Sequence, residues 1–423
     1  MASSSQKAHK SHKFPPTDPT KKSSAEFPTE ILELLLRNLD PHHRVSLISC
    51  CNQYHRKGTP IDFDYEFVPP SRVEMLSKTT CSHMVKNVQT TVIHGYGDTL
   101  PCFVACSELQ GLSCANRSLA GIPALNDAAK LKTLDLVGCL GKSTVPVNRS
   151  LTDISALNGA TELRVLDLMG CTRVTDIWAL RHCVSLEMLD LTWCMEVDDI
   201  SPLAYLTRLK SLVIDGCDSL CDLTPLSKCV KLRHLEVVGC LDLLTLAFLE
   251  PLTVLGRLSL RQSDYIKDLS GLPSGVALQW LDLRNCCRLK NIEALKNCPA
   301  LKSLDLGNCT RLEYIEGLEN CPALTTLDLG GCPEIKEILP VAACLNLTSL
   351  VLSACTNIKD ISPLALCDNL TYVDLSFCVS IESLLPLSAC EKLKELNIYR
   401  CDCKLHNDVS VVKQDKNIDR LTM

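Results

Sequence analysis

The residues best suited to chemistry in this chain are its cysteines, which number 27 among 423 residues. Thiolates and imidazoles are the ligands that zinc prefers, and four cysteines lie near His83 and His94 in the sequence: Cys81, Cys102, Cys106 and Cys114. Their spacing lacks the C-x2-C pairs that zinc modules use. We therefore expect buried thiols in an N-terminal cap, and a zinc-dependent ligase site is the alternative.

No other set of residues has the spacing of a catalytic centre. The sequence lacks Gly-x-Ser-x-Gly, a phosphate-loop Gly-Lys-Thr and His-Glu-x-x-His, and its ten histidines are scattered. We therefore expect a protein that is not an enzyme and that binds no metal and no cofactor. The net charge of -6 argues against a general nucleic-acid binder, which would normally be basic.

Apolar runs are short throughout the chain. None approaches the length of about 18 residues that a membrane-spanning helix needs, and residues 1–22 lack the apolar stretch of a signal peptide. The odd number of cysteines also prevents complete pairing within one chain. We expect reduced thiols, no membrane association and a location in the cytoplasm or the nucleus.

Most of the cysteines belong to a repeat. The frame L-x-x-L-x-L-x-x-C is first clear from Leu163 to Cys171, and it returns every 23 residues until the copy that starts at Leu393. Earlier copies start at Leu109 and Leu131, which makes thirteen starts. We number the first Leu as position 0, so the Leu residues at positions 3 and 5 face one side of a short strand. Because such a strand is too short to be stable alone, successive copies should stack as a parallel sheet over one core.

The second half of each repeat reads I-x-D-I-x-P-L, as in Ile358-Lys-Asp360-Ile361. A Pro recurs sixteen residues into the repeat and often follows Ser or Thr: Pro202, Pro225, Pro340, Pro363 and Pro386. We expect the Ser or Thr to cap a helical turn that has the Pro at its start. Only one turn fits before the next strand, so this side should carry 3-10 or short turns rather than α-helices.

This pattern resembles the leucine-rich-repeat family over residues 109–401. The resemblance implies an α/β solenoid, which is a right-handed superhelix with short parallel strands and a convex side of 3-10 turns. The short backs are most similar to internalin-like and phosphatase-regulator-like repeats. Cysteines stand at position 8 in eleven repeats and at position 20 in seven. The family uses Asn or Cys at position 8 to satisfy loop carbonyls, and a small apolar side chain packs the interior at position 20. We expect both columns to be structural.

The N-terminal part of the chain has a different pattern. Residues 1–25 are polar and predict a disordered tail. Residues 27–39 begin with Phe27-Pro28 and space their apolar side chains as a helix does, and a second amphipathic run extends from Val45 to Tyr54. Two short apolar helices cannot bury themselves, so this small helical hairpin must pack on the repeats or on a partner.

The segment Phe27-Pro28-Thr29-Glu30-Ile31-Leu32 resembles the opening motif of the F-box family, although Cys50 and Tyr54 replace its usual Val and Trp. The resemblance implies an F-box-like module over residues 26–66 that docks on a Skp-type adaptor of a cullin–RING ubiquitin ligase. The positions that would face the adaptor or form the core of the hairpin are Pro28, Ile31, Leu32, Leu35 and Leu39. The alternative is an ordinary helical cap for the repeats.

The segments that flank the repeats should cover the open edges of the sheet. Residues 67–108 would link and cap the N-terminal end, and residues 402–423 would cap the other end. The pattern predicts a strand over Ile61–Phe67, a helix over Arg72–Val85 and a strand over Val88–Ile93. The step from Leu131 to Leu163 contains nine extra residues, at about 140–148, which form either a contact loop or a tolerated excursion.

Positions 1, 2, 4, 6 and 7 of the frame should face outward on the concave side. Position 4 is often Asp, and Asp282, Asp305 and Asp328 follow one another on adjacent rungs of the sheet. Two such charges repel by only about 1 kcal/mol in water, so a solvated ladder is tolerable. An acidic docking stripe is the alternative.

A second cluster combines basic and aromatic residues, which are enriched at binding hot spots. It occupies three consecutive rungs around the repeat that has Ser263 in place of Cys, and its members are Arg233, His234, Arg257, Arg261, Trp280 and Arg284. Further outward aromatics are Trp193, Tyr372, Phe377 and Tyr399. We predict this central patch as the partner site, and scattered solvated charge is the alternative.

These features predict a protein-interaction scaffold. The F-box resemblance implies the substrate-recognition subunit of a Skp–cullin–F-box ubiquitin ligase, which promotes ubiquitin-dependent protein degradation. Its partners would be a Skp-type adaptor and a substrate protein, with no nucleic acid and no membrane. The alternative is a leucine-rich-repeat regulatory protein without the ligase link, similar to phosphatase regulators.

Overall fold

The computed structural model describes residues 61–67, 85–91, 110–115, 119–122, 125–126, 128–136, 150–239, 245–274, 277–402, 405–414 and 418–423. All of them belong to one compact unit, Thr59–Met423. Several predictions lie outside these residues: the helical hairpin with Pro28, Ile31, Leu32, Leu35 and Leu39, the cysteines Cys81, Cys102 and Cys106, and the loop at 140–148.

Two negative findings apply to the described residues alone. Among them, no helix has the length and apolar character needed to cross a membrane. Within the same residues, no three His, Cys, Asp or Glu side chains come together as metal ligands would.

The described residues form one parallel sheet in which sixteen strands follow in chain order. The strands are β1 (Ile61–Phe67), β2 (Val85–Thr91), β3 (Gly111–Ala115), β4 (Thr133–Asp135), β5 (Val165–Asp167), β6 (Met188–Asp190), β7 (Ser211–Asp215), β8 (His234–Val238), β9 (Arg257–Ser259), β10 (Trp280–Asp282), β11 (Ser303–Asp305), β12 (Thr326–Asp328), β13 (Ser349–Val351), β14 (Tyr372–Asp374), β15 (Glu395–Asn397) and β16 (Arg420–Thr422). The thirteen predicted repeat starts correspond to β3–β15, so the prediction of a stacked parallel solenoid is confirmed.

The ends of the sheet extend beyond the repeats. The predicted strand Ile61–Phe67 is confirmed as β1, and the predicted strand Val88–Ile93 begins three residues earlier, as β2. Val85 starts this strand and does not end a helix, and 72–84 lie outside the described residues. After the last repeat, α5 (His406–Gln414) precedes β16, which pairs with β15.

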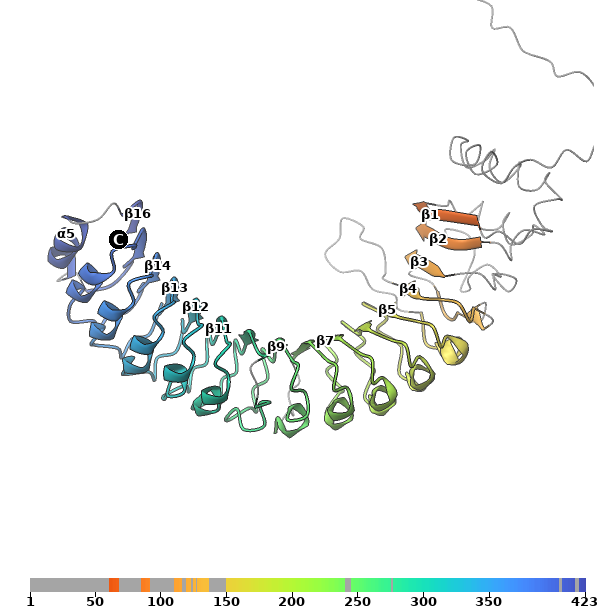
Figure 1. Ribbon diagram of the computed structural model, residues 1–423. Coiled ribbons are helices and arrows are strands. Elements are labelled where there is room, and N and C mark those ends of the chain that lie inside the picture. The colour runs from red at the N-terminus through yellow and green to blue at the C-terminus, as the bar shows by residue number, and fades with distance from the viewer. Residues whose placement is uncertain are drawn as a thin grey trace, which may run out of the picture. The chain divides into compact units, whose positions relative to one another are not determined.

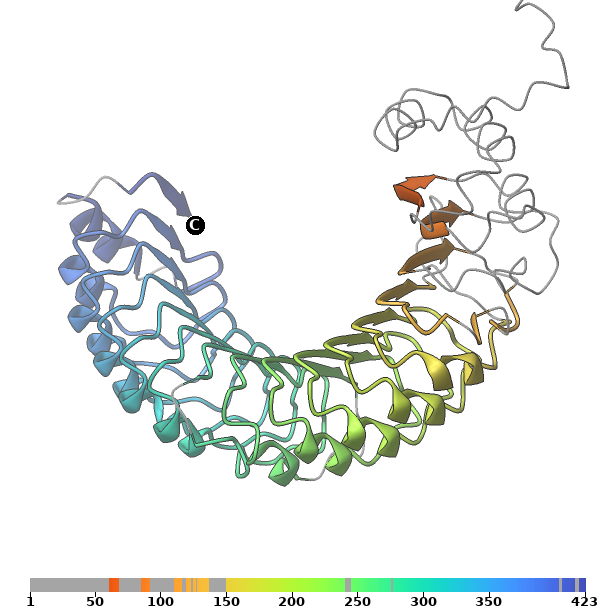
Figure 2. The same cartoon turned by 45° about the vertical axis from the view of Figure 1, so that its right-hand side comes forward.

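The convex side carries single 3-10 turns, as the sequence predicted (Figures 1 and 2). These turns are η3 (Ser155–Gly159), η4 (Trp178–His182), η5 (Ser201–Tyr205), η6 (Thr224–Lys228), η7 (Ala247–Leu249), η8 (Glu293–Asn297), η9 (Leu318–Asn320), η10 (Leu339–Ala343), η11 (Ser362–Leu366) and η12 (Leu385–Ala389). Between η7 and η8 the repeat that contains Ser263 has no 3-10 turn among its described residues.

The predicted caps of these turns are wrong in one respect. The Pro does stand in the first turn of η5, but Ser201 accepts no capping hydrogen bond there. Instead, Asp199 Oδ1 accepts a hydrogen bond from the Ser201 backbone N–H at 2.7 Å, and Ser201 Oγ donates to Asp199 Oδ2. Asp360 does the same for Ser362. A carboxylate is the stronger acceptor, so the Asp of I-x-D-I satisfies the open N–H group.

The core consists of columns of Leu and Cys that run through all the repeats. Leu166, Leu189, Leu212 and their equivalents are almost completely buried. At position 8 the thiols donate to a carbonyl of the preceding repeat, as Cys355 Sγ does to Leu329 O at 3.1 Å. The prediction for this column is confirmed. The cysteines at position 20 are buried as predicted, and they also donate across repeats, as Cys390 Sγ does to Leu364 O at 3.3 Å.

Burial keeps these thiols protonated. Burial is the largest influence on the Cys355 thiol and raises its pKa to about 12. Burial likewise raises the pKa of Cys344 at position 20 to about 11. Because the thiolate is the reactive form, thiols in both columns are inert at neutral pH and act as small hydrogen-bonding core residues.

Position 7, at the corner after each strand, has a backbone conformation that the sequence did not reveal. Eleven successive repeats hold this residue at a φ between 57° and 79°, in the left-handed region: Gly170, Trp193, Gly216, Gly239, Gln262, Asn285, Asn308, Gly331, Ala354, Phe377 and Arg400. Its N–H continues the ladder, as Phe377 N does to Tyr399 O at 2.8 Å. Left-handed backbone costs an L-residue about 1 kcal/mol or more, and Gly escapes this cost.

Candidate protein-binding surface

Side chains on the concave face are arranged in columns. The parallel register pairs residues at the same frame position, so His234 lies beside Arg257, and Arg257 lies beside Trp280. Neighbouring strands are about 4.8 Å apart, which lets side chains of one column touch across rungs. The structure thus brings residues of the predicted central patch together on β8, β9 and β10.

The pair formed by Arg257 and Trp280 is the centre of this patch. The Arg257 guanidinium carbon lies 4.9 Å from the centroid of the Trp280 ring, which is a cation–π contact. Arg257 is exposed and Trp280 is half-buried. Arg233 is also exposed and immediately precedes β8. The arrangement presents a cation held against an aromatic face to any partner in the concave space.

His234 contributes hydrogen bonding rather than charge. Its Nδ1 lies 3.2 Å from Ser211 Oγ, and its Nε2 lies 3.8 Å from a carboxylate oxygen of Glu236. Burial lowers the pKa of His234, and Arg257 lowers it further against the opposing effect of Glu236. These surroundings favour the neutral form of the imidazole.

Arg261 and Arg284 are not free cations, so the predicted basic patch is mixed in charge. Arg261 Nη2 lies 3.1 Å from Glu236 Oε1 and 3.4 Å from Asp215 Oδ2. Arg284 Nη2 lies 2.6 Å from Asp282 Oδ2, and its Nε lies 3.2 Å from Asp305 Oδ2. Arg261 thus reaches carboxylates at positions 6 and 4 of the two preceding rungs, and Arg284 reaches those at position 4 of its own rung and of the following one.

The Asp column differs from the solvated ladder that we expected. Asp282 is only 1% exposed, and Asp305 and Asp328 are half-buried. Each carboxylate accepts a hydrogen bond from the backbone N–H two residues later, as Asp305 does from Gly307 N at 3.0 Å and Asp328 from Gly330 N at 2.8 Å. The column therefore shapes the corner after each strand.

Burial raises the pKa of two carboxyl groups in this column, Asp305 and Asp328. Burial raises the pKa of Asp305 to about 6, and Asp328 adds to the rise while Arg284 opposes it. Burial also raises the pKa of Asp328. The rungs that carry Asp305 and Asp328 have Gly307 and Gly330 at position 6. No side chain at position 6 therefore covers these two carboxyl groups.

Trp193 lies away from the central patch, at position 7 after β6. An ideal Cβ on Gly216 would be 2.6 Å from Trp193 Cδ1, so the indole lies directly over the equivalent corner of the next rung. The φ of 68° favours Gly216 there, and the close approach of the indole leaves no room for a Cβ. Trp193 is half-buried by this contact.

Sequence reasoning missed the acidic partners Asp215 and Glu236 and the corner residue Arg400. A signal for the first two was present, because Glu236 stands at position 4 one rung before Arg261 and Asp215 stands at position 6 two rungs before it. The signal for Arg400 was the composition of the position-7 column. Gly and Asn fill six of its positions, and Trp193, Phe377 and Arg400 stand out as large side chains.

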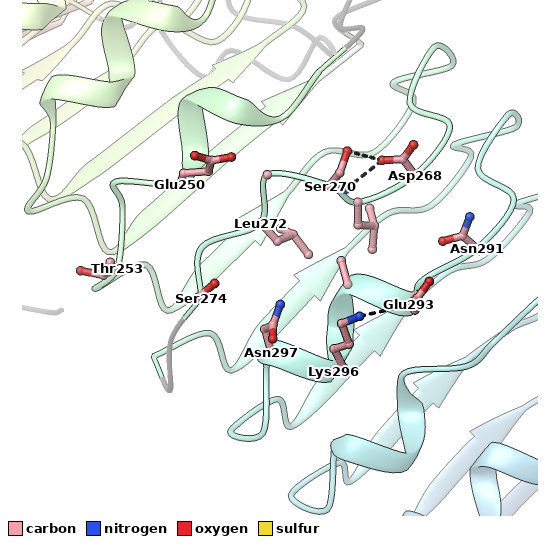
Figure 3. A pocket seen from close by; sticks show the side chains of 13 residues that line it. Glu250, Thr253, Asp268, Ser270, Leu272, Ser274, Asn291, Glu293, Lys296 and Asn297 are labelled. Atoms are coloured by element: carbon pink, nitrogen blue, oxygen red, sulfur yellow. Dashed lines mark hydrogen bonds and ion pairs between the residues drawn. The ribbon is translucent and has the colours of Figure 1, made fainter.

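The repeat that contains Ser263 leaves a hollow of about 670 Å³ on the convex side (Figure 3). Gly271 has a φ of 96°, and an ideal Cβ on it would lie 2.5 Å from a backbone carbon of Leu246. This segment therefore packs tightly on the preceding repeat and leaves space toward η8. The walls are polar and include the Glu293–Lys296 ion pair and Asp268, which accepts hydrogen bonds from Ser270.

Comparisons with known proteins agree with this architecture. Residues 276–320 match the family model described as leucine-rich repeats (2 copies), and they contain β10, η8, β11 and η9. With the constant register and the 3-10 backs, this match shows that the chain carries leucine-rich repeats and that its described part is a leucine-rich-repeat solenoid. Comparison with curated protein sequences found no match.

Of three similar solved structures, the first supports the fold. An internalin (InlF) of Listeria monocytogenes has 18% identity and a TM-score of 0.57, covering 82% of this chain and 92% of that chain. A leucine-rich-repeat protein of Leptospira interrogans has 16% identity and a TM-score of 0.47, covering 86% and 95%. The functional domain of InlJ from Listeria monocytogenes, which includes a cysteine ladder, has 18% identity and a TM-score of 0.39, covering 77% and 65%. At these identities the likeness concerns the fold alone.

Proposed function

We propose that this chain is a protein-interaction scaffold that performs no chemistry of its own and holds a partner protein on its concave face. The observation that carries this proposal is the exposed Arg257 held 4.9 Å from the Trp280 ring at the middle of the sheet. Trp and Arg are the residue types most enriched at binding hot spots. The ion pairs of Arg261 and Arg284, at position 6 of the same two rungs, add a polar border of mixed charge.

The finer proposal is that the chain is the substrate-recognition subunit of a Skp–cullin–F-box ubiquitin ligase and promotes ubiquitin-dependent degradation. The motif from Phe27 to Leu32 supports it, because Pro28, Ile31 and Leu32 match the F-box pattern. The N-terminal module would dock on the Skp-type adaptor, and the solenoid would hold the substrate. The proposal includes a location in the cytoplasm or nucleus, supported by the buried thiols at positions 8 and 20 of the described repeats, such as Cys355 and Cys344.

Adaptor binding is tested by co-expressing the full chain with a Skp-type adaptor and measuring co-purification. We expect a stable complex that is lost in the double variant Pro28→Ala with Leu32→Ala. The matched control is Lys21→Ala with Lys22→Ala, which alters the preceding polar tail and should leave the complex intact. If the unaltered chain captures no adaptor, the ligase role is wrong, and a leucine-rich-repeat regulator without the ligase link becomes the better interpretation.

The central patch is tested separately by affinity capture with quantitative mass spectrometry. The double variant Trp280→Ala with Arg257→Glu should weaken capture of specific partners by about tenfold or more, as loss of a hot spot does. Because Arg257 is exposed, its replacement should leave thermal unfolding nearly unchanged. Lys231→Glu reverses an exposed charge before β8 and is the control. Undiminished capture by the double variant would exclude the patch as the partner site.

A further inference from the structure

The left-handed corners at position 7 single out a second surface at the C-terminal end of the solenoid. Six of the eleven corner residues are Gly or Asn, which tolerate positive φ. Phe377 and Arg400 occupy the same conformation on adjacent rungs, at φ values of 61° and 60°. Bulky side chains in this backbone region point to a role that the local fold does not explain.

Phe377 and Arg400 form one assembly with Tyr399, which we name the C-terminal platform. The Phe377 and Tyr399 rings meet edge to face, with centroids 5.6 Å apart and planes at 82°. The Arg400 guanidinium carbon lies 5.6 Å from the Phe377 ring centroid and 5.4 Å from that of Tyr399. Arg400 Nε also donates to Tyr399 Oη at 3.3 Å.

The platform is open to solvent although its parts hold one another in place. Phe377 and Tyr399 are each 41% exposed. Two mutually fixed aromatic rings form a firm apolar surface that loses little side-chain freedom when a partner binds.

Arg400 differs from Arg261 and Arg284 of the central patch in the groups that contact its guanidinium. Arg261 and Arg284 both lie within ion-pair distance of carboxylates. Within the described part of the chain, no carboxylate is that close to Arg400, whose guanidinium is held by the two rings instead. A guanidinium fixed in this way is prepared to bind a carboxylate with two parallel hydrogen bonds.

We propose that the C-terminal platform binds a segment of a partner protein that presents an Asp or Glu side chain next to an apolar side chain. The carboxylate pairs with Arg400, and the apolar side chain packs against Phe377 and Tyr399. This inference rests on the proposed protein-binding function, but it requires neither the adaptor-binding module nor the central patch.

The test selects phage-displayed random peptides on the full chain and then measures enriched synthetic peptides by fluorescence polarisation. The expected peptides share a carboxylate next to an apolar residue. Phe377→Gly should weaken their binding about tenfold or more, and Arg400→Gln should do the same at low salt. Because Gly relieves the left-handed strain, the thermal midpoint of Phe377→Gly should match or exceed that of the parent.

Ala354→Gly is the matched control, because Ala354 has the same left-handed backbone one rung earlier and presents no ring. It should bind the peptides as the parent does. No enriched peptides, peptides with basic residues in place of acidic ones, or binding unchanged in Phe377→Gly would each overturn the inference. Peptides lost only in Trp280→Ala with Arg257→Glu would overturn it too, while leaving the central patch as a binding site.

Discussion

Replacing Ser263 with Cys should stabilise the repeat in which the position-8 column lacks its thiol-to-carbonyl hydrogen bond. Where the repeats follow the regular 23-residue step, the described position-8 thiols donate to a carbonyl 26 positions earlier, as Cys286 does to Leu260 O at 3.3 Å. Ser263 interrupts this series. Its Oγ is fully buried and has no hydrogen-bond partner among the described residues. The C–O bond is shorter than a C–S bond, so the hydroxyl stops short of the carbonyl that a thiol would reach.

The magnitude follows from the unpartnered hydroxyl. A buried polar group without a partner costs about 1–3 kcal/mol. A thiol at the same site is less polar and larger, and it would restore the hydrogen bond toward Val237. We therefore expect Ser263→Cys to stabilise this part of the solenoid by about 1–2 kcal/mol. Cys355→Ser, in an intact repeat, should cost a similar amount.

Hydrogen exchange is the appropriate assay, because a long repeat array need not unfold in one step. The amides of Leu260 and Leu283, which bond to the next rung, report local opening free energy around the altered site. Under reducing conditions they should exchange more slowly in Ser263→Cys than in the parent. Cys221→Ser, at an exposed cysteine, should change exchange by no more than about 0.5 kcal/mol and serves as the control.

Two results would refute this reasoning. Faster or unchanged exchange in Ser263→Cys would show that the buried hydroxyl costs nothing. A neutral Cys355→Ser would show that the thiol-to-carbonyl bonds contribute no stability, and the cysteine column would then be a matter of size alone.

Three further predictions follow from the same geometry. Asp167→Asn should stabilise the protein by about 1 kcal/mol at pH 7, since burial raises the pKa of Asp167 to about 6 from an ordinary value of 3.8 and an amide keeps the bond to Met169 N. The gain should vanish as pH falls from 6 to 4, because the folded carboxyl takes up its proton first. In unfolding experiments Asp199→Ala should cost about 1 kcal/mol and Ser201→Ala less, because the Asp accepts the capping hydrogen bond. In native alkylation followed by mass spectrometry, Cys221 should react well before Cys298, whose pKa burial raises to about 11.

Each of these has an outcome that contradicts it. A gain in stability for Asp167→Asn that does not change with pH would mean that burial does not disfavour the ionised carboxylate. A larger loss for Ser201→Ala than for Asp199→Ala would restore Ser as the cap. Early labelling of Cys298 would mean that the repeats open readily at their convex side.

The repeat architecture was predictable because it depends on local periodicity. Leu at positions 3 and 5 must face one side of a strand, and Cys at position 8 fits a corner that recurs every 23 residues. Each of these columns needs only its own repeat to be recognised. The cap was misassigned for a related reason, since both Asp199 and Ser201 recur in register and only geometry shows which one accepts the hydrogen bond.

The chemistry of the concave face was harder to predict because it depends on pairs from different repeats. Arg261 reaches Asp215, which is 46 residues away, over an intervening rung. The partial burial of Asp305 and Asp328 likewise depends on neighbours across the sheet. The sequence therefore located the patch residues on the correct rungs, but it could not show that two of their charges are already paired.

At the position-7 corner the fold fixes the backbone conformation but leaves the side chain free to vary. The N–H of Trp193 bonds to Asp215 O at 2.6 Å, and that of Ala354 bonds to Ser376 O at 2.7 Å, so the inter-rung ladder fixes this backbone whatever the side chain is. Gly would satisfy the same geometry at lower conformational cost. Where the chain has Phe377 and Arg400 instead, the extra cost brings no additional inter-rung backbone bond. The contacts among Phe377, Tyr399 and Arg400 offset part of this cost. Because the same side chains remain exposed, contact with a partner can offset more, which makes these two corners candidates for recognition.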